Sequence, residues 1–280
     1  LQQERNKVGD RIAELKQEGE DASEKIERMQ EVKQQISTLE DKVDELKDER
    51  DELRYQIGNL LAEDVPEGEG EEDNPEIRTW EPEKGKKEDS TLAADFLEKH
   101  DLLSAEKATE VGGERAYYLS PELLQLSQAL INFSVDFLKK KDFGVYQVPY
   151  MLEEESISAA VDLETFQDQL YQVNENNRYL IGTAEHALAA KYQGEVIEEE
   201  LPLKLGGYST NFRREAGKHG KQTRGLWRVH QFEKVEQFAF CKPENHLDIL
   251  KETLNNAEEI MQELGLPYRV VDICDGDISN

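Results

Sequence analysis

The sequence has few cysteines and no long hydrophobic run. Its two cysteines, Cys241 and Cys274, show neither a disulfide framework nor the spacing of metal ligands, which favours a reducing, cytoplasmic location. No stretch of 18 apolar residues occurs, so we predict no transmembrane helix and no membrane partner. The charged start, Leu1 to Arg11, lacks the apolar core of a secretory signal.

Basic residues are also scarce, with 34 Lys and Arg against 62 Asp and Glu and a formal charge of −28. A protein that binds nucleic acid over a broad surface would show the opposite sign. Contacts with a nucleic acid would have to come from local basic groups or from the backbone. With 280 residues, 37% of them hydrophobic, the chain can form one substantial core and an accessory element.

Residues 1–61 carry a heptad pattern. A first helix with Val8, Ile12 and Leu15 on one face ends near Gly19, and a longer helix follows. The seam of the longer helix comprises Met29, Val32, Ile36, Leu39, Val43, Leu46, Arg50, Leu53, Ile57 and Leu60. The short break predicts an antiparallel helical hairpin. Most such segments dimerise or brace a fold, and the basic residues of this one carry no specific signal for RNA.

Residues 62–90 are rich in Pro, Gly and charge, which predicts a linker with a short strand at Ile77 to Trp80. Residues 91–280 read as an α+β domain built on an antiparallel sheet flanked by helices. The expected helices are Leu92–Leu103, capped by Ser90 or Thr91, Pro121–Lys141, capped by Ser120, and His246–Leu264. The expected strands are Val145–Tyr150, Tyr179–Thr183, Leu203–Arg214, Leu226–Phe240 and Tyr268–Ile273.

The two longest strands carry charge on one face. Arg213 and Glu215 are two residues apart, so alternation predicts that both leave the same face of the first strand. On the second strand the shared face comprises Arg228, His230, Phe232, Lys234 and Glu236, with Trp227, Val229 and Val235 turned to the core. The connecting loop, Gly217 to Arg224, adds Lys218, Lys221 and Arg224, a composition that suits polyphosphate. The alternative to a ligand-binding face is that these charged side chains form a solvent-exposed outer face of the sheet.

A second pair, Thr183 and Glu185, follows the apolar residues Tyr179 to Ile181. A carboxylate there could hold an ammonium group with help from the hydroxyl, although a T-x-E tripeptide is common by chance.

Four stretches resemble the seryl-tRNA synthetase family of class II aminoacyl-tRNA synthetases, in the family's order. Asn211 to Glu236, NFRREAGKHGKQTRGLWRVHQFEKVE, is similar to motif 2 almost residue for residue. IGTAEH (Ile181 to His186) resembles the T-x-E serine-binding loop, and QALINFSVDF (Gln128 to Phe137) with Val145 to Pro149 resembles motif 1 of the dimer interface. EEDNPEIRTW (Glu71 to Trp80) resembles the junction after the helical arm. The segments STNFRREAG and TAEH resemble the archaeal form of these motifs more than the typical bacterial form.

The resemblance implies roles for individual residues. Arg213, with Arg214 beside it, would bind ATP and stabilise charge at the α-phosphate, and Glu215, Phe232 and the backbone of Val229 would bind adenine. Thr183, Ala184 and Glu185 would form the site for the serine amino group. Glu236 would accept a hydrogen bond from the serine hydroxyl, and His230 and the cysteines would have no catalytic role. Mg²⁺ would accompany ATP.

The resemblance also implies the partners: tRNA(Ser), bound through the arm at residues 1–61, L-serine, and a second copy of the chain bound through motif 1. The family's third motif and the start of its arm domain are missing from the sequence, so we expect a fragment that is poorly active alone. Two alternatives remain open. One is a non-catalytic coiled-coil interaction protein with a synthetase-like domain, and the other is a ligase that loads an amino acid onto a carrier protein.

Overall fold

The computed structural model describes residues 1–55, 57–58, 60–85, 92–161, 163–173, 177–215 and 226–278. The chain forms two compact units: one of Leu1–Asn74 with Ile273–Asn280, and one of Pro75–Asp272. The boundaries predicted from composition, at residues 61 and 90, stay a prediction. The division between the compact units falls inside that predicted linker, between Asn74 and Pro75.

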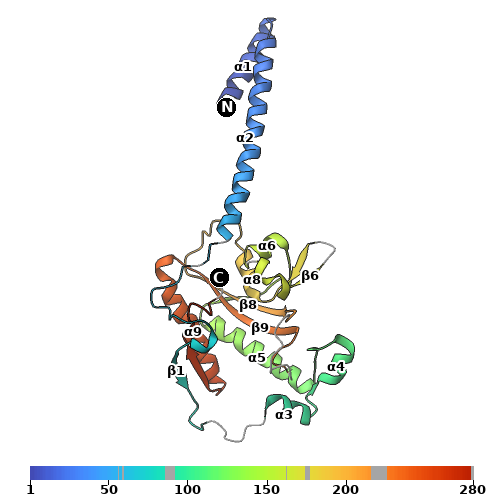
Figure 1. The fold of residues 1–280 in the computed structure, drawn as a ribbon, viewed down its shortest axis with the longest axis vertical. Coiled ribbons are helices and arrows are strands. Elements are labelled where there is room, and N and C mark those ends of the chain that lie inside the picture. Colours follow the sequence, from blue (N-terminus) through green and yellow to red (C-terminus); the bar gives the residue numbers. More distant parts are fainter. Residues whose placement is uncertain are drawn as a thin grey trace. The chain divides into compact units, whose positions relative to one another are not determined.

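The first unit contains a helical hairpin of α1 (Gln2–Glu18) and α2 (Ser23–Tyr55), as predicted. Gly19 ends α1 in the left-handed conformation, which glycine adopts without a steric penalty. Val32 and Ile36 are buried, whereas Val43, farther along the same seam, is 48% exposed. The reason is visible in Figure 1: α1 runs beside only one end of the longer α2, and among the described residues of this unit no other helix covers the rest of the seam.

Residues 66–74 are ordered by the end of the chain. The Gly68 amide donates to Asp275 Oδ1 at 2.8 Å, and Asn74 Nδ2 donates to Asp277 Oδ2 at 2.8 Å. Asn74 Oδ1 in turn accepts from the Cys274 amide at 2.9 Å. Every one of these partners lies about 200 residues away in the chain, so composition alone could not show that this stretch is more than a connection.

The second unit is built on a three-stranded sheet in the order β4 (Gly144–Gln147), β8 (Leu203–Phe212) and β9 (Gln231–Phe240). The β8–β9 pair is antiparallel, as predicted, and β4 runs parallel to β8. Helices cover both faces of the sheet, α8 (Ala184–Ala190) on one side and α5 (Pro121–Lys140) on the other (Figure 1).

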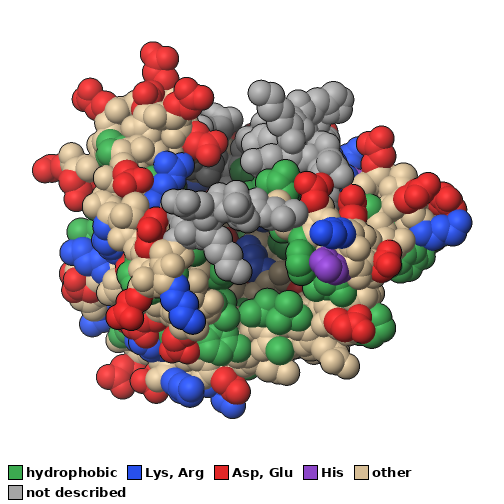
Figure 2. Space-filling view, turned by 90° about the horizontal axis from the view of Figure 1, so that it is seen from below, with side chains coloured by type: hydrophobic (Ala, Val, Ile, Leu, Met, Phe, Trp, Pro, Cys, Tyr) green, Lys and Arg blue, Asp and Glu red, His purple; other side chains and the backbone are tan. Residues whose placement is uncertain are grey.

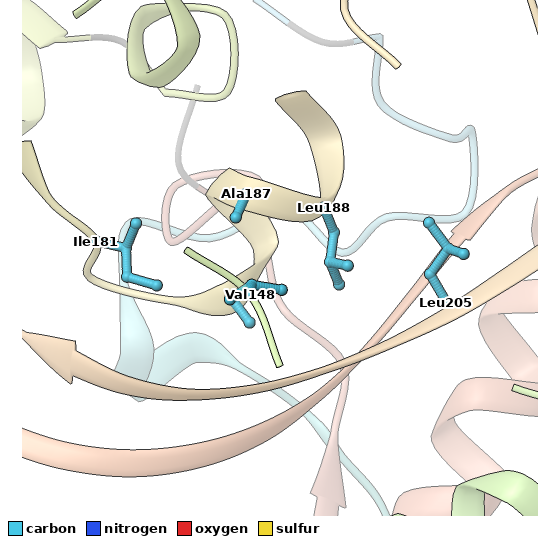
Figure 3. Packing of buried hydrophobic residues seen from close by; sticks show 6 residues of the cluster. Val148, Ile181, Ala187, Leu188 and Leu205 are labelled. Atoms are coloured by element: carbon cyan, nitrogen blue, oxygen red, sulfur yellow. The ribbon is translucent and has the colours of Figure 1, made fainter. Parts of the chain in front are cut away.

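The core between α8 and the sheet is small and apolar. Ile181, Leu188 and Leu205 are at most 1% exposed, and Figure 3 shows their side chains in the layer between the helix and the strands. Gly207 permits this close packing, since a Cβ there would lie 2.6 Å from Ala184 Cβ. On the opposite face, Phe137 and Leu138 of α5 form a second cluster, against which Val235 packs.

Smaller elements complete the second unit. The remaining strands are β1 (Glu76–Trp80) paired with β10 (Tyr268–Val271), β2 (Leu103–Ser104) paired with β3 (Tyr118–Leu119), and the sheet of β5 (Met151–Glu153), β7 (Arg178–Leu180) and β6 (Tyr171–Val173). The remaining helices are α3 (Ala93–Lys99), α4 (Ala105–Gly112), α6 (Glu154–Ser158), α7 (Leu163–Phe166) and α9 (His246–Glu263), and the 3₁₀ turns are Glu71–Asp73 in the first unit and Gln167–Gln169 and Pro243–Asn245 in the second.

Several predicted elements are confirmed within a few residues. α5 begins at Pro121 with Ser120 as its cap, and Ser120 Oγ accepts from the Leu123 amide at 3.3 Å. The helix expected at Leu92–Leu103 is shorter, because the chain after α3 turns at Asp101, which has a φ of +54°, into β2. Its predicted caps, Ser90 and Thr91, lie outside the described residues. None of the described helices is long and apolar enough to cross a membrane.

Candidate functional site

One face of the β8–β9 hairpin changes from apolar to polar along its length. Leu205 lies opposite Phe238, then Gly207 opposite Glu236, and farther along Asn211 lies opposite Phe232. Directly opposed residues share a face of the sheet, so this is the face that packs on α8. The apolar end forms the core, and the polar end is left for chemistry.

Thr183 connects α8 to the polar end of this face. It is the N-cap of the helix, and its Oγ1 accepts from the Glu185 amide at 3.3 Å. The same hydroxyl donates to the carboxylate of Glu236. Lys234 Nζ lies 2.5 Å from Glu236 Oε2 and compensates its charge. The structure therefore brings together Thr183 and Glu236, which are 53 residues apart in the chain.

Arg213 lies between two cavities. The hairpin cavity, of about 320 Å³, is lined by Arg213, Glu215, Leu226, Trp227, Arg228, Val229 and Phe232. The α8 cavity, of about 220 Å³, is lined by Val161, Phe166, Gln169, Leu170, Gly182, Thr183, Glu185, His186 and Arg213. Arg213 Nε donates to the Gly182 carbonyl at 3.1 Å, and its guanidinium lies 5.2 Å from the centre of the Phe232 ring. These contacts hold the cation where it can reach ligands in both cavities.

The geometry at Arg213 and Glu215 differs from the predicted one. β8 ends at Phe212, and Glu215 has a φ of +50°, so simple strand alternation does not place these side chains. Both nevertheless line the hairpin cavity. The Glu215 carboxylate accepts from Arg228 Nη1 at 2.6 Å, and the Glu215 side chain is only 14% exposed.

Two predictions for the second strand were wrong. β9 begins only at Gln231, so the alternation assumed for earlier residues does not hold. Trp227 was expected in the core but is 73% exposed at the hairpin cavity. His230 was expected beside Phe232, but it lines a different cavity together with Phe212 and Gln231.

Three predicted site residues do not line either cavity in the described part of the chain, and one of them, Glu236, is reached only through its contact with Thr183. The side chain of Arg214 is exposed and does not line either cavity, although its amide donates to the Gln169 carbonyl at 2.8 Å. Ala184 is fully buried in the core under α8, so its side chain cannot meet a ligand. The loop residues Lys218, Lys221 and Arg224 lie outside the described residues.

The position of His186 was not predicted from the sequence. It lines the α8 cavity, is 6% exposed, and its Nδ1 has no hydrogen-bond partner among the described residues. Burial, together with the nearby charges of Lys234 and Arg213, lowers the pKa of His186 to about 4. The imidazole is therefore neutral at physiological pH. It lies within the IGTAEH stretch, but one turn of helix gives no signal that separates a core histidine from a cavity histidine.

No group of three His, Cys, Asp or Glu side chains that could hold a metal ion occurs in the described ranges. Two carboxylates near the cavities already have cationic partners, Glu215 with Arg228 and Glu236 with Lys234. The described residues therefore do not form a protein-built cage for Mg²⁺. An ion that arrives as Mg·ATP would be held mainly by the phosphates, as is usual for Mg²⁺.

Comparison with known proteins agrees with this architecture. Residues 1–61 match the model of the seryl-tRNA synthetase N-terminal domain, and residues 165–280 match that of the tRNA synthetase class II core domain (G, H, P, S and T). The serine–tRNA ligase of Thermoplasma acidophilum is 40% identical over 99% of this chain and 68% of its own length.

Two solved structures are also similar over the whole chain. The seryl-tRNA synthetase of Pyrococcus horikoshii complexed with ATP superposes with a TM-score of 0.81 at 36% identity, covering 99% of this chain and 67% of that one. The cytoplasmic serine–tRNA ligase of Naegleria fowleri in complex with AMP gives 0.79 at 34% identity, covering 99% and 65%. The chain thus spans about two thirds of the length of these relatives. By the matched domains, the identity and the shared fold, the chain belongs to the seryl-tRNA synthetases, a family of class II aminoacyl-tRNA synthetases.

Proposed function

We propose that this protein is a serine–tRNA ligase, which activates serine with ATP and transfers it to tRNA(Ser). The observation that carries the proposal is the position of Arg213, which lines both the hairpin cavity and the α8 cavity. Formation of an aminoacyl-adenylate requires a carboxylate and an α-phosphate to meet, and a cation between two cavities suits that meeting point.

The hairpin cavity is proposed to bind ATP. Phe232 offers a ring face for adenine, and Glu215 offers a carboxylate for its amino group. The buried backbone at Val229 supplies a further hydrogen bond to the base. Arg213 contacts the α-phosphate with a planar guanidinium, a geometry that matches phosphate oxygens. Arg214 is proposed as a weaker ATP contact, since its exposed side chain does not line the cavity.

The α8 cavity is proposed to bind serine. Thr183 and Glu185 line it and would hold the ammonium group, with the chain at Ala184 fixing the distance between them. Glu236, bonded to Thr183, would accept a hydrogen bond from the serine hydroxyl. Alanine has no hydroxyl to donate to that carboxylate, and the loss of this hydrogen bond discriminates between the two amino acids.

The proposed reaction has two steps. A carboxylate oxygen of serine attacks the α-phosphorus of Mg·ATP, the bond to the β-phosphate oxygen breaks, and pyrophosphate leaves. A ribose hydroxyl at the 3′ end of tRNA then attacks the carbonyl carbon of the adenylate, and AMP leaves with the electron pair of the broken C–O bond. Arg213 stabilises the charge that develops on the phosphate oxygens, and no side chain forms a covalent intermediate.

The helical hairpin of α1 and α2 is proposed to bind tRNA(Ser) by shape and backbone contacts. On the face shown in Figure 2, which does not display the hairpin, acidic and basic side chains intermingle, so the net charge of −28 does not make that face uniformly acidic. A homodimer through the motif 1 region, Gln128 to Phe137 with Val145 to Pro149, is supported by exposed apolar side chains there, with Leu130 at 40% and Tyr146 at 44%. Serine, ATP and tRNA meet in the cytoplasm, and the free cysteines Cys241 and Cys274 suit that reducing compartment.

The test, made with the intact protein rather than with these 280 residues alone, is amino-acid-dependent exchange of pyrophosphate into ATP, followed by charging of tRNA(Ser). We expect exchange with serine, little with alanine or threonine, and loss of exchange in Arg213→Ala. No exchange with serine would refute the proposal and favour a non-catalytic interaction protein. Exchange without charging of tRNA would favour a ligase acting on a carrier protein.

A further inference from the structure

Glu215 adopts a backbone conformation that a residue with a Cβ rarely takes. Its φ is +50°, in the left-handed region, which has a steric cost for every residue except glycine. Such a conformation persists only where the surrounding structure holds it. Because the Glu215 side chain lines the hairpin cavity, the groups that hold Glu215 also determine the geometry of that cavity.

The main chain of Glu215 is held by Arg115. Arg115 Nη1 donates to the Glu215 carbonyl oxygen at 2.7 Å in a partly buried contact between residues 100 apart in the chain. Arg115 lies between α4 and β3 and itself has a φ of +64°. The Glu215 carboxylate is held separately, by Arg228 at 2.6 Å. One arginine therefore fixes the peptide and another fixes the side chain.

A second carbonyl nearby is held in the same way. His230 Nδ1 lies 2.9 Å from the Arg213 carbonyl oxygen, and its ring meets Tyr171 edge-on at 6.1 Å. Arg115 and His230 line one cavity of about 360 Å³, which is separate from the hairpin cavity. The side chains in this third cavity thus bind the peptide groups of Arg213 and Glu215, whose own side chains line the hairpin cavity.

We propose that Arg115 is a positioning residue for nucleotide binding, which acts through the main chain of Glu215. The inference deepens the proposed function and rests on it, because it takes the hairpin cavity as the ATP site. Arg115 does not itself line that cavity, so it acts on ATP only through the residue it holds. A lysine could still donate to the carbonyl, whereas methionine, which has no N–H or O–H group, could not.

The experiment compares Arg115→Met and Arg115→Lys with Arg178→Met in the intact protein. Arg178 is a matched control, an arginine of the same unit that pairs with the exposed Glu153 at 3.3 Å. ATP binding is measured directly by the fluorescence of Trp227, which lines the hairpin cavity. The KM values for ATP and serine are measured in pyrophosphate exchange.

We expect Arg115→Met to weaken ATP binding by about tenfold or more, the loss typical of a charge-assisted hydrogen bond. The KM for serine should change by less than about threefold on the same scale, Arg115→Lys should restore part of the ATP affinity, and Arg178→Met should match the unmodified protein. Unchanged ATP binding in Arg115→Met, or equal losses for ATP and serine, would overturn the inference.

A double-variant cycle tests whether Arg115 affects ATP binding through Glu215. If Arg115 acts through Glu215, combining Arg115→Met with Glu215→Gln should weaken ATP binding less than the product of the two single losses. Fully multiplicative losses would contradict a route through Glu215. Because fluorescence needs no turnover, a protein that binds ATP but fails to exchange pyrophosphate would refute the proposed function alone. A protein that binds no ATP would refute both proposals.

Discussion

At the scale of single residues, Glu236 is proposed to determine the specificity for serine. Its carboxylate accepts from Thr183 and lies 2.5 Å from Lys234, on the sheet face that packs on α8. Glu233, three residues earlier on the same strand, lies on the other face, where it binds Ser127 at 3.0 Å and Tyr208 at 2.9 Å. The two glutamates therefore differ in surroundings while sharing a strand.

We predict that Glu236→Gln lowers the preference for serine over alanine by about tenfold or more, because an amide offers the hydroxyl a weaker acceptor. The preference is the ratio of kcat/KM for the two amino acids in pyrophosphate exchange. Glu233→Gln is the control and should leave the ratio unchanged. Equal effects of the two substitutions would contradict the assignment of the serine pocket.

His186 predicts a dependence of stability on pH. In the unfolded chain its pKa is near 6.5, and in the folded protein burial lowers the pKa to about 4. Between these values the unfolded state binds a proton that the folded state does not. Stability therefore falls as the pH falls through this window, by up to about 1.4 kcal/mol per pH unit from this group.

The measurement is urea unfolding at several pH values between 7 and 4, with His186→Gln beside the unmodified protein. The variant lacks the titrating group, so its free energy of unfolding should fall less steeply over that range. Parallel curves for the two proteins would show that His186 is not held neutral in the fold.

At the scale of elements, α5 illustrates how a short sequence signal fixes a helix end. Ser120 accepts from the Leu123 amide, and Pro121 occupies the first helical position. We predict that Ser120→Ala lowers the free energy of unfolding by about 1 kcal/mol, the usual cost of losing an N-cap. The control is Ser134→Ala within α5, where Ser134 Oγ donates to the Leu130 carbonyl of its own helix.

Thermal unfolding monitored by circular dichroism distinguishes these two variants. Alanine is the best helix former, so Ser134→Ala should be neutral or slightly stabilising while Ser120→Ala lowers the Tm. If both lowered the Tm equally, the cap would have no special role.

The elements also show why part of the site could be predicted from sequence and part could not. Periodicity predicted α2 and the pair β8–β9, because burial of one face leaves a repeating pattern in a long element, and the cap at Ser120 with Pro121 predicted the start of α5. It failed at Trp227 and His230, since the strand begins only at Gln231 and the side-chain alternation breaks before it. The contact of Thr183 with Glu236 depends on how α8 packs on the sheet, and that of Arg115 with Glu215 on a backbone turn, neither of which has a period.

At the scale of the whole molecule, the two units should have separable functions. The hairpin of α1 and α2 belongs to one unit, and the residues around Arg213 belong to the other. Val32 is fully buried in the hairpin, whereas Val43, in the same heptad seam, is 48% exposed.

We predict that Val32→Asp, which places a charge in the hairpin core, lowers charging of tRNA by about tenfold or more. Pyrophosphate exchange should stay within about threefold, because the buried charge disturbs only the hairpin. Val43→Asp is the matched control and should leave both activities nearly unchanged. A loss of exchange in Val32→Asp equal to the loss of charging would contradict the separation.

Arg213 is proposed to contact the nucleotide and the amino acid together, so that the hairpin cavity and the α8 cavity form one adenylate site. The most direct test is calorimetric titration with a non-hydrolysable seryl-adenylate analogue, beside AMP and serine separately. We predict that the analogue binds at least about a hundredfold more tightly than AMP or serine alone. Arg213→Ala should lose most of this gain in affinity. If the analogue bound no better than AMP, or bound equally well to Arg213→Ala, the two cavities would not form one site.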